Sequence, residues 1–465
     1  MGTLAIIVSL LLLMFLAYRG VSVLILAPLM AALAVLLSGE IGYFLPIYTG
    51  TFMTALSNYV LAFLPIFLLG ALFGRLMADS GAAMTLSRWI MQRLGARHAI
   101  LTVALATGLL TYGGVSVFVV AFAIYPIARS LFQEADIPKR LLPPAIALGA
   151  FTCTMTAMPG TPSIHNAIPI PFFGTNVFAA PGLGLIASAI MMGGGLMWLW
   201  SRHAKARAAG EGYGVHPFDA ADKDTQDDTG RYSQMPVLLA LLPLVLVVGV
   251  NAWFTYGVFP GMDFSALTER FPAVNPAKST GMWALIIALV VACSVLVVMR
   301  WKHWHNLKDT INKGAFGFML PLFNTASEVG YGAVIASMAG FVVIRDAVLN
   351  VSDNPLISEA FAMNIIAGIT GSASGGMSIA LQTLGADYLT LAQQVGISPE
   401  LLHRVAVIAA GCLDTLPHNG AVITLLAICG LTHRDSYLNI AMLTVAIPLA
   451  ALAVVIGLGT MLGSF

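Results

Sequence analysis

Residues 415–426 read TLPHNGAVITLL, so a proline, a histidine, an asparagine and a glycine interrupt an otherwise apolar run. Residues 158–169 read MPGTPSIHNAIP and interrupt a second apolar run with the same His-Asn pair. Proline removes a backbone donor and glycine frees the backbone, so both stretches predict helices that stop and restart. These two breaks indicate which kind of fold the chain adopts.

The composition indicates a membrane protein. Of the 465 residues, 58% are hydrophobic and 9% are charged, and the mean hydropathy is +0.89. Soluble domains carry about 25% charged residues. Apolar runs near the length of a membrane-spanning helix recur along the chain, without the alternation of membrane β-strands. We therefore predict an all-α polytopic membrane protein, surrounded by lipid and without a nucleic-acid partner.

The four cysteines do not suggest a disulfide framework or a zinc site. Each lies alone in an apolar segment, at positions 153, 293, 412 and 429. No pair has the short spacing that metal-binding or redox cysteines show. We expect no cofactor.

One apolar run cannot be a simple crossing. Loops rich in lysine and arginine stay in the cytoplasm, and the run 100–128 separates two such basic segments. A hairpin over residues 99–131, entering from the cytoplasm and turning at Gly113 and Gly114, removes the conflict. A second hairpin over 357–391, interrupted by GSASGGMSI, has few basic residues beside it and is expected to enter from outside.

The chain therefore reads as two repeats of one order: three spans, a re-entrant hairpin, a broken helix and a final span. Counting crossings, the second repeat starts on the opposite side from the first, so the repeats have inverted topology. The predicted parts are the first repeat at 1–200, with hairpin 99–131 and broken helix 141–178; a cytoplasmic linker at 201–234; and the second repeat at 235–465, with hairpin 357–391 and broken helix 401–430.

Interrupted helices at membrane depth indicate a secondary transporter. Each unpaired backbone group there costs several kcal/mol unless protein or a water-filled cavity satisfies it. In secondary transporters the breaks of two inverted repeats converge near the midplane, where helix N-termini face an anionic substrate. The two repeats then allow two packings, one open to each side of the membrane.

The side chains at the four interruptions are neutral and rich in hydrogen-bond donors, and none of the interruptions contains lysine or arginine. Such a set suits a small, weakly charged organic anion that also carries a hydroxyl. The predicted substrate-binding residues are Gly114, Ser116, Thr161, Ser163, His165, Asn166, Ser374, Gly376, Ser378, Thr415, His418 and Asn419.

Three ionisable residues are candidates for ion coupling: Asp414, His418 and Glu328. An ionised aspartate at the centre of a span costs about 2.5–3.5 kcal/mol on insertion scales, so an embedded acid is a functional candidate. Histidine titrates near neutral pH. These groups favour proton coupling, while sodium, which prefers carbonyls, hydroxyls and an aspartate, stays open.

Each candidate also has a purely structural alternative. Serine and threonine in apolar helices often bond the preceding turn. Asp414 could cap the helix after Pro417, and His165 and His418 could pin the breaks. The glycine pairs could simply allow close helix packing.

Several motifs together resemble the gluconate permease (GntP) family of the ion transporter superfamily. They are YGGVSVFVVAFAIYPIA at 112–128, LMADSGAA at 76–83, AMPGTPSIHNAIP at 157–169, NTASEVGYGAVI at 324–335 and DTLPHNGAVI at 414–423. The resemblance covers nearly the whole chain. Within the family, SVFVVAFAIYP and NTASEVGYGAV are most similar to 3-hydroxybutyrate permeases.

The resemblance implies a proton-coupled carrier for gluconate or related hydroxy acids in the bacterial inner membrane, not an enzyme. It also implies a homodimer in which a transport domain moves like an elevator against a scaffold. By motif, Ser116, Asn166, Ser378 and Asn419 would line the substrate, and Asp414, His418 and Glu328 would handle the proton.

Three rival functions remain at this stage. A gluconate symporter would need more hydrogen-bonding groups for its longer polyol substrate. An intramembrane metalloenzyme could use His165, His418 and Asp414, but the chain has no HExxH or comparable ligand spacing. A passive channel would transport its substrate without any ion gradient.

Overall fold

The computed structural model describes the chain except residues 1, 20, 116, 217–234, 273 and 418. The described residues form helices and no strand, which confirms the predicted all-helical class. Five helices are long and apolar enough to cross a membrane, or seven if each of two sharply bent helix pairs counts as one span. The predicted residues Ser116 and His418 lie outside the described residues.

The first half of the chain runs from α1 to α12. Its elements are α1 (Gly2–Tyr18), α2 (Val23–Leu37), η1 (Ile41–Tyr43), α3 (Phe44–Pro46), η2 (Ile47–Phe52), α4 (Met53–Asp79), α5 (Ala82–Leu94), η3 (Ala96–His98), α6 (Ala99–Tyr112), α7 (Val117–Glu134), η4 (Lys139–Leu141), α8 (Leu142–Ala150), α9 (Cys153–Thr156), α10 (Ile164–Ala167), α11 (Ile170–Phe173) and α12 (Pro181–Ala208).

The second half runs from α14 to α25. Its elements are α14 (Val237–Ala252), η6 (Trp253–Val258), η7 (Phe259–Gly261), α15 (Ser265–Arg270), α16 (Pro276–Met299), η8 (Trp301–His303), α17 (Leu307–Gly317), α18 (Met319–Ser337), α19 (Phe341–Leu349), α20 (Pro355–Thr370), α21 (Ala373–Gln394), α22 (Pro399–Leu413), α23 (Gly420–Ile428), α24 (His433–Ala441), η9 (Met442–Ala446) and α25 (Ile447–Leu462).

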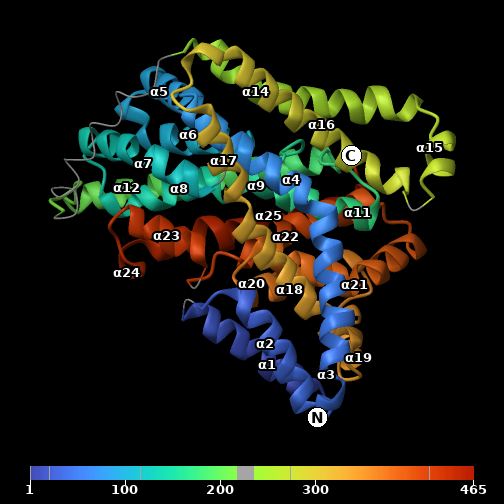
Figure 1. Ribbon diagram of the computed structural model, residues 1–465. Coiled ribbons are helices and arrows are strands. Elements are labelled where there is room, and N and C mark those ends of the chain that lie inside the picture. The colour runs from blue at the N-terminus through green and yellow to red at the C-terminus, as the bar shows by residue number, and fades with distance from the viewer. Residues whose placement is uncertain (1, 20, 116, 217–234, 273, 418) are drawn as a thin grey trace.

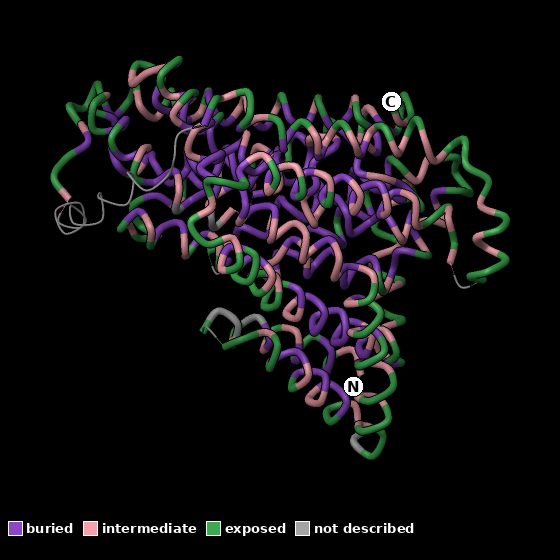
Figure 2. Tube along the Cα trace, turned by 45° about the horizontal axis from the view of Figure 1, so that its top comes forward, coloured by how far each residue is buried: buried purple, intermediate pink, exposed green. Residues whose placement is uncertain are grey.

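The helices α8 and α22 form the centre of the molecule. Every residue of α8 is buried, and so is every residue of α22 from Leu401 to Cys412. The pairs α1–α2 and α14–α16 pack at opposite margins, and α4 extends between them (Figure 1). Figure 2 shows the same distribution, with buried residues concentrated in the interior and exposed ones along the outer helices.

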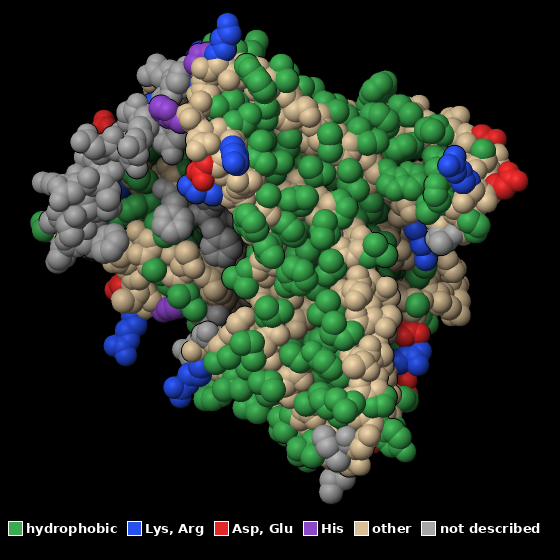
Figure 3. Space-filling view, viewed as in Figure 1, with side chains coloured by type: hydrophobic (Ala, Val, Ile, Leu, Met, Phe, Trp, Pro, Cys, Tyr) green, Lys and Arg blue, Asp and Glu red, His purple; other side chains and the backbone are tan. Residues whose placement is uncertain are grey.

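The outer surface is largely apolar. Leu61, Leu238 and Met461 each leave about 80% of their surface exposed, at 80%, 80% and 81%. Figure 3 shows hydrophobic side chains across the broad middle of one face, with most charged side chains toward its margins. Such a surface needs hydrocarbon around it, because soluble proteins rarely expose large apolar patches. The molecule is a membrane protein.

Two pairs of consecutive helices overlap the segments 99–131 and 357–391, for which the sequence predicts re-entrant hairpins. The helices α6 and α7 pack together and are joined through Gly114, whose φ of 91° suits glycine. The helices α20 and α21 also pack together, and Gly371 turns between them with a φ of 63°. A Cβ added to Gly376 would collide with the backbone of Ala367, so these two arms touch just behind the turn. The side of the membrane from which each hairpin enters stays a prediction.

The two broken helices differ in how far they unwind. In the second half, α22 ends at Leu413 and α23 begins at Gly420. In the first half, α8 is followed by three pieces of only four residues each, α9, α10 and α11. Four prolines between residues 159 and 171 explain the longer interruption, because each proline removes a backbone donor.

Several boundaries differ from those expected. The predicted linker starts at residue 201, but α12 continues to Ala208, and Lys205 and Arg207 in its last turn favour a helix C-terminus. The first two predicted spans, α1 and α2, have 17 and 15 residues. These lengths lie at or below the usual minimum for a complete crossing.

Candidate functional site

Asn419 joins the second break to the turn of the second hairpin. Its Nδ2 donates to the carbonyl oxygens of Gly371 and Asp414, both at 2.9 Å. Its Oδ1 accepts from the backbone N–H groups of Ala421 at 2.7 Å and Val422 at 2.9 Å, which caps α23. The amide therefore fixes the restart of the helix and the hairpin turn in one position.

Asp414 ends α22 and faces the start of α21. It is buried, and the backbone N–H groups of Thr415 and Ala373 lie against its carboxylate. Its Oδ1 is buried and has no partner among the described residues. One oxygen of this acid is thus left to bind a proton, an ion or a ligand.

Glu328 meets the same helix start from another direction. It lies in the middle of α18, is buried, and its Oε2 has no partner among the described residues. A Cβ added to Gly375 would collide with this oxygen, so the carboxylate packs directly against the first turn of α21. Tyr59 of α4 is also buried here, and its hydroxyl has no partner among the described residues.

The start of α21 is therefore a polar site flanked by two acids. Ser372 caps the helix, since its Oγ accepts from the N–H of Gly375 at 3.0 Å, and it lies 3.4 Å from the Oγ of Ser374. Ser378 donates to the carbonyl of Ser374 at 2.6 Å. The N-terminus of a 22-residue helix carries a partial positive charge and favours anions.

Asn166 has a similar role in the first break. Its Nδ2 donates to the carbonyl of Thr161 at 3.1 Å and to that of Val177 at 2.7 Å. Asn166 and Asn419 thus each bond the carbonyl five residues earlier. Ser163 caps α10 by accepting from the N–H of Asn166, and its Oγ donates to the carbonyl of Met155.

The first hairpin turn lies against this break. A Cβ added to Gly114 would be 3.1 Å from Pro162, and the Tyr112 hydroxyl donates to the carbonyl of Pro159 at 2.9 Å. Two buried polar atoms here have no partner among the described residues, Oγ1 of Thr161 and Nδ1 of His165. They are available to a ligand.

The predicted site residues form two groups, carried by helices that pack against each other. One group surrounds the start of α21, and the other surrounds the first break. The helix α10, which carries Asn166, packs against α21, which carries Ser378. The arm α7 packs against α23. Thr415 is different, because its hydroxyl donates to Thr444 in η9 at 2.7 Å.

His403 and Arg404 are buried at the interface of the two halves, and neither was predicted from the sequence. Arg404 donates to the carbonyl of Ala179 from Nε at 3.0 Å and Nη2 at 2.7 Å, and from Nη1 to the Thr156 carbonyl at 3.3 Å. His403 contacts Oγ1 of Thr175 at 2.6 Å through Nδ1, and both residues contact Oδ1 of Asn166. They hold the unwound first break from the opposite half.

A signal for these residues exists in the sequence. Two ionisable residues stand together ahead of the apolar run VAVIAAG at 405–411. An ionisable residue at membrane depth is a functional candidate by default. The same rule indicates Glu359 in α20, which is fully buried with neither carboxylate oxygen partnered among the described residues.

A model of the GntP family of permeases matches residues 1–447. The chain belongs to the GntP permease family. It is 43% identical, over 98% of both chains, to an uncharacterized transporter of Bacillus subtilis, YxjC. A 70-residue stretch, 15% of this chain and 16% of the relative, is 41% identical to an uncharacterized transporter of Haemophilus influenzae. This GntP permease is therefore a membrane transporter and not an enzyme.

Proposed function

We propose that this GntP permease is a proton-coupled symporter of small hydroxycarboxylates in the bacterial inner membrane, with 3-hydroxybutyrate as the best-fitting substrate. The position of Asp414 and Glu328 at one helix N-terminus carries the proposal. Both acids are buried, and each has a carboxylate oxygen without a partner among the described residues. The groups that would hold the substrate are neutral donors around them.

Charge balance at the start of α21 gives the coupling mechanism. A substrate carboxylate that arrives at the start of α21 would add a negative charge beside two buried acids, and neighbouring like charges disfavour each other's ionised forms. Protonation of Asp414 or Glu328 removes one of these charges. The helix N-terminus and the capping serines can then receive the substrate anion. Proton and anion thus bind together and leave together.

Alternating access would follow from inverted repeats, and three similarities between the halves support this part of the proposal. Both halves have the same order of hairpin, broken helix and final long helix. Asn166 and Asn419 make the same bond across their breaks. The broken helices also begin alike, with IPKRLLPPAIALGA at 137–150 and ISPELLHRVAVIAA at 397–410. An elevator movement of the hairpins and breaks against the remaining helices completes the proposal.

The substrate is tested by uptake of labelled 3-hydroxybutyrate into proteoliposomes, with gluconate, lactate and citrate as competitors. We expect 3-hydroxybutyrate to be accumulated and to be displaced by lactate more readily than by gluconate or citrate. Stronger displacement by gluconate would identify the permease as a sugar-acid symporter instead. Replacing sodium with choline on both sides of the vesicle membrane distinguishes a coupled proton from a coupled sodium ion. Proton coupling predicts unchanged uptake.

A further inference from the structure

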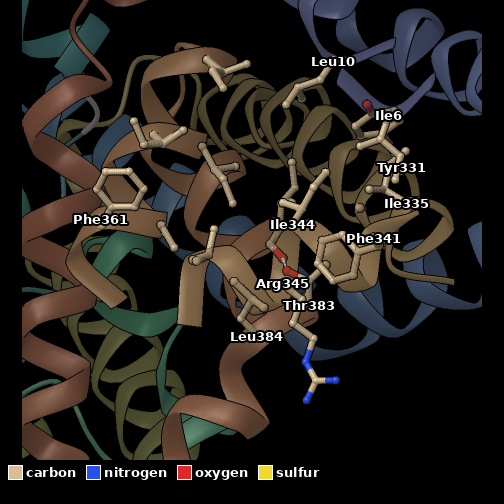
Figure 4. Close-up of a pocket in the computed structure, with 17 residues that line it drawn as sticks. Ile6, Leu10, Tyr331, Ile335, Phe341, Ile344, Arg345, Phe361, Thr383 and Leu384 are labelled. Carbon is tan, nitrogen blue, oxygen red and sulfur yellow. Dashed lines mark hydrogen bonds between the residues drawn. The ribbon is translucent and has the colours of Figure 1, made fainter. Parts of the chain in front are cut away.

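An apolar pocket with a volume of about 140 Å³ lies beside the second hairpin. The arms α20 and α21 form one side, and α1, α18 and α19 form the other. Figure 4 shows Ile344, Phe341 and Leu384 around its centre, with Phe361 and Arg345 farther out. The pocket is separate from the polar site at the start of α21.

The few polar side chains in the lining already have partners. The hydroxyl of Tyr331 lies 2.9 Å from Oγ of Ser9, and the Thr383 hydroxyl donates to the carbonyl of Ile379 at 2.8 Å. Water needs two to four polar partners, and an apolar cavity of about 150 Å³ lined by Leu, Ile and Phe stays dry and binds hydrocarbon. The pocket therefore suits an apolar ligand.

The pocket reaches the apolar surface of the protein. Two lining residues on α20, Phe361 and Ile365, leave 45% and 42% of their surface exposed. Val342 and Val343 on the adjacent α19 are also exposed. Because the surrounding medium is the bilayer, the molecules that meet this opening are lipid acyl chains.

Charged groups of both signs stand at the rim. Arg345 donates to Asp387 through Nε at 2.9 Å and Nη2 at 2.6 Å, which leaves its Nη1 outside this ion pair. The Arg345 side chain keeps 41% of its surface exposed. Asp346 is exposed beside it. A cation and two carboxylates at the end of an apolar pocket are complementary to a headgroup that carries a phosphate and an ammonium.

We propose that this pocket binds a segment of one acyl chain of a zwitterionic phospholipid of the phosphatidylethanolamine type. The phosphate contacts Arg345, the ammonium contacts Asp346 and Asp387, and the chain enters between the hairpin arms and α1. The lipid thus lies between the second hairpin and the helices beside it. This site does not depend on the substrate or on the coupling ion proposed above.

The test uses the full-length permease in vesicles of phosphatidylethanolamine and phosphatidylcholine that contain a phosphatidylethanolamine with a photoreactive acyl chain. After irradiation, labelled peptides are identified by mass spectrometry. We expect labelling concentrated on α19 and α20 around Ile344, Phe361 and Ile365. Labelling spread evenly over exposed apolar residues elsewhere, such as Met197 and Leu238, would overturn the proposal.

Two isoleucines of α20 provide a matched pair of variants. Ile365 lines the pocket and Ile357 does not, yet each is 42% exposed. Ile365→Trp should fill the opening and remove most of the labelling, while Ile357→Trp should leave it unchanged. Equal labelling of the two variants would contradict the site. Size-exclusion profiles that match the unaltered protein verify that both variants are folded.

The headgroup is tested by competition and by one further variant. Unlabelled phosphatidylethanolamine should compete better than phosphatidylglycerol, whose headgroup has no ammonium. Arg345→Gln combined with Asp387→Asn keeps a neutral hydrogen-bonding pair and should weaken this preference. Equal competition by both lipids in the unaltered protein would contradict the proposed headgroup recognition.

Discussion

At the scale of single residues, Asn419 illustrates how one amide organises the candidate site. Asn419→Ala removes the cap of α23 and the bond to Gly371, and the loss of such a cap costs about 1 kcal/mol. We expect a lower melting temperature in detergent. Asn350→Ala is the control, because this exposed side chain donates to the carbonyl of Asp346, within its own helix turn. It should change stability by less than about 0.5 kcal/mol.

The same variant separates a structural role from direct substrate binding. A raised apparent KM for the substrate with an unchanged melting temperature would mean that the Asn419 side chain contacts the substrate. Its hydrogen bonds within the protein would then contribute little to stability. A lower melting temperature with a changed maximal rate favours positioning of the hairpin turn.

Arg404 supports a second prediction. Arg404→Gln leaves the carbonyls of Ala179 and Thr156 without their donor, and each unsatisfied buried acceptor costs about 1–3 kcal/mol. We expect Arg404→Gln to lower the melting temperature in detergent. Arg404→Lys should have a melting temperature between those of Arg404→Gln and the unaltered protein. Arg97→Gln, at an exposed position, is the control and should behave like the unaltered protein. Stability of Arg404→Gln equal to that of this control would contradict the role.

The sequence indicated where the important residues lie more reliably than what they do. Asn166 and Asn419 stand out as repeated polar residues in apolar runs. The side-chain amides of both residues bond to groups of the protein itself. Among these are the carbonyls of Val177 and Gly371, which only the fold brings near. His403 and Arg404 were overlooked because they lie within the unbroken helix α22, and only the tertiary structure places them against the first break.

At the scale of elements, the contact between Glu328 and α21 is tested by two glycines. Gly375→Ala places a methyl group where the Glu328 carboxylate lies, whereas Gly420→Ala meets no atom of the described residues within 4 Å. We expect Gly375→Ala to displace the acid and to abolish accumulation of substrate in proteoliposomes. Gly420→Ala should retain it. Normal accumulation by Gly375→Ala would show that the position of Glu328 is not required.

The re-entrant path of the hairpins is tested by labelling of single cysteines. Gln92 precedes the first hairpin, Gln133 lies in its last turn, and Gln394 ends the second hairpin; all three are exposed. In intact cells, a membrane-impermeant thiol reagent should label Gln394→Cys and should not label Gln92→Cys or Gln133→Cys. The native cysteines in the described structure are buried. Labelling of only one of the two positions around the first hairpin would mean that this segment crosses the membrane.

The helical hairpins and breaks were predictable because glycine and proline act locally on the backbone. The turn at Gly114 and the ends of α22 and α23 follow from these residues. The second hairpin turns at Gly371, at the start of the GSASGGMSI stretch, and the glycine pair Gly375 and Gly376 lies in the first turns of α21. The extent of unwinding in the first break was not predictable. It depends on Arg404, a partner more than 200 residues away, that satisfies the freed carbonyls.

At the scale of the whole molecule, the sequence identified an all-helical membrane protein of the GntP family, because composition and combined motifs are properties of the full chain. It did not reveal that Asp414 and Glu328 both lie against the start of α21. These residues are 86 positions apart, counting from 328 to 414, and only the packing of α18 and α22 around the hairpin brings them together.

The central claim is that protonation of Asp414 or Glu328 couples transport of the anion to the proton gradient. Uptake driven by an imposed pH gradient tests it most directly. Unaltered permease in proteoliposomes should accumulate labelled 3-hydroxybutyrate when the interior is alkaline. Asp414→Asn, which cannot release a proton, should exchange substrate without accumulating it, while exposed Asp353→Asn should accumulate it normally. Full gradient-driven accumulation by Asp414→Asn would contradict the account.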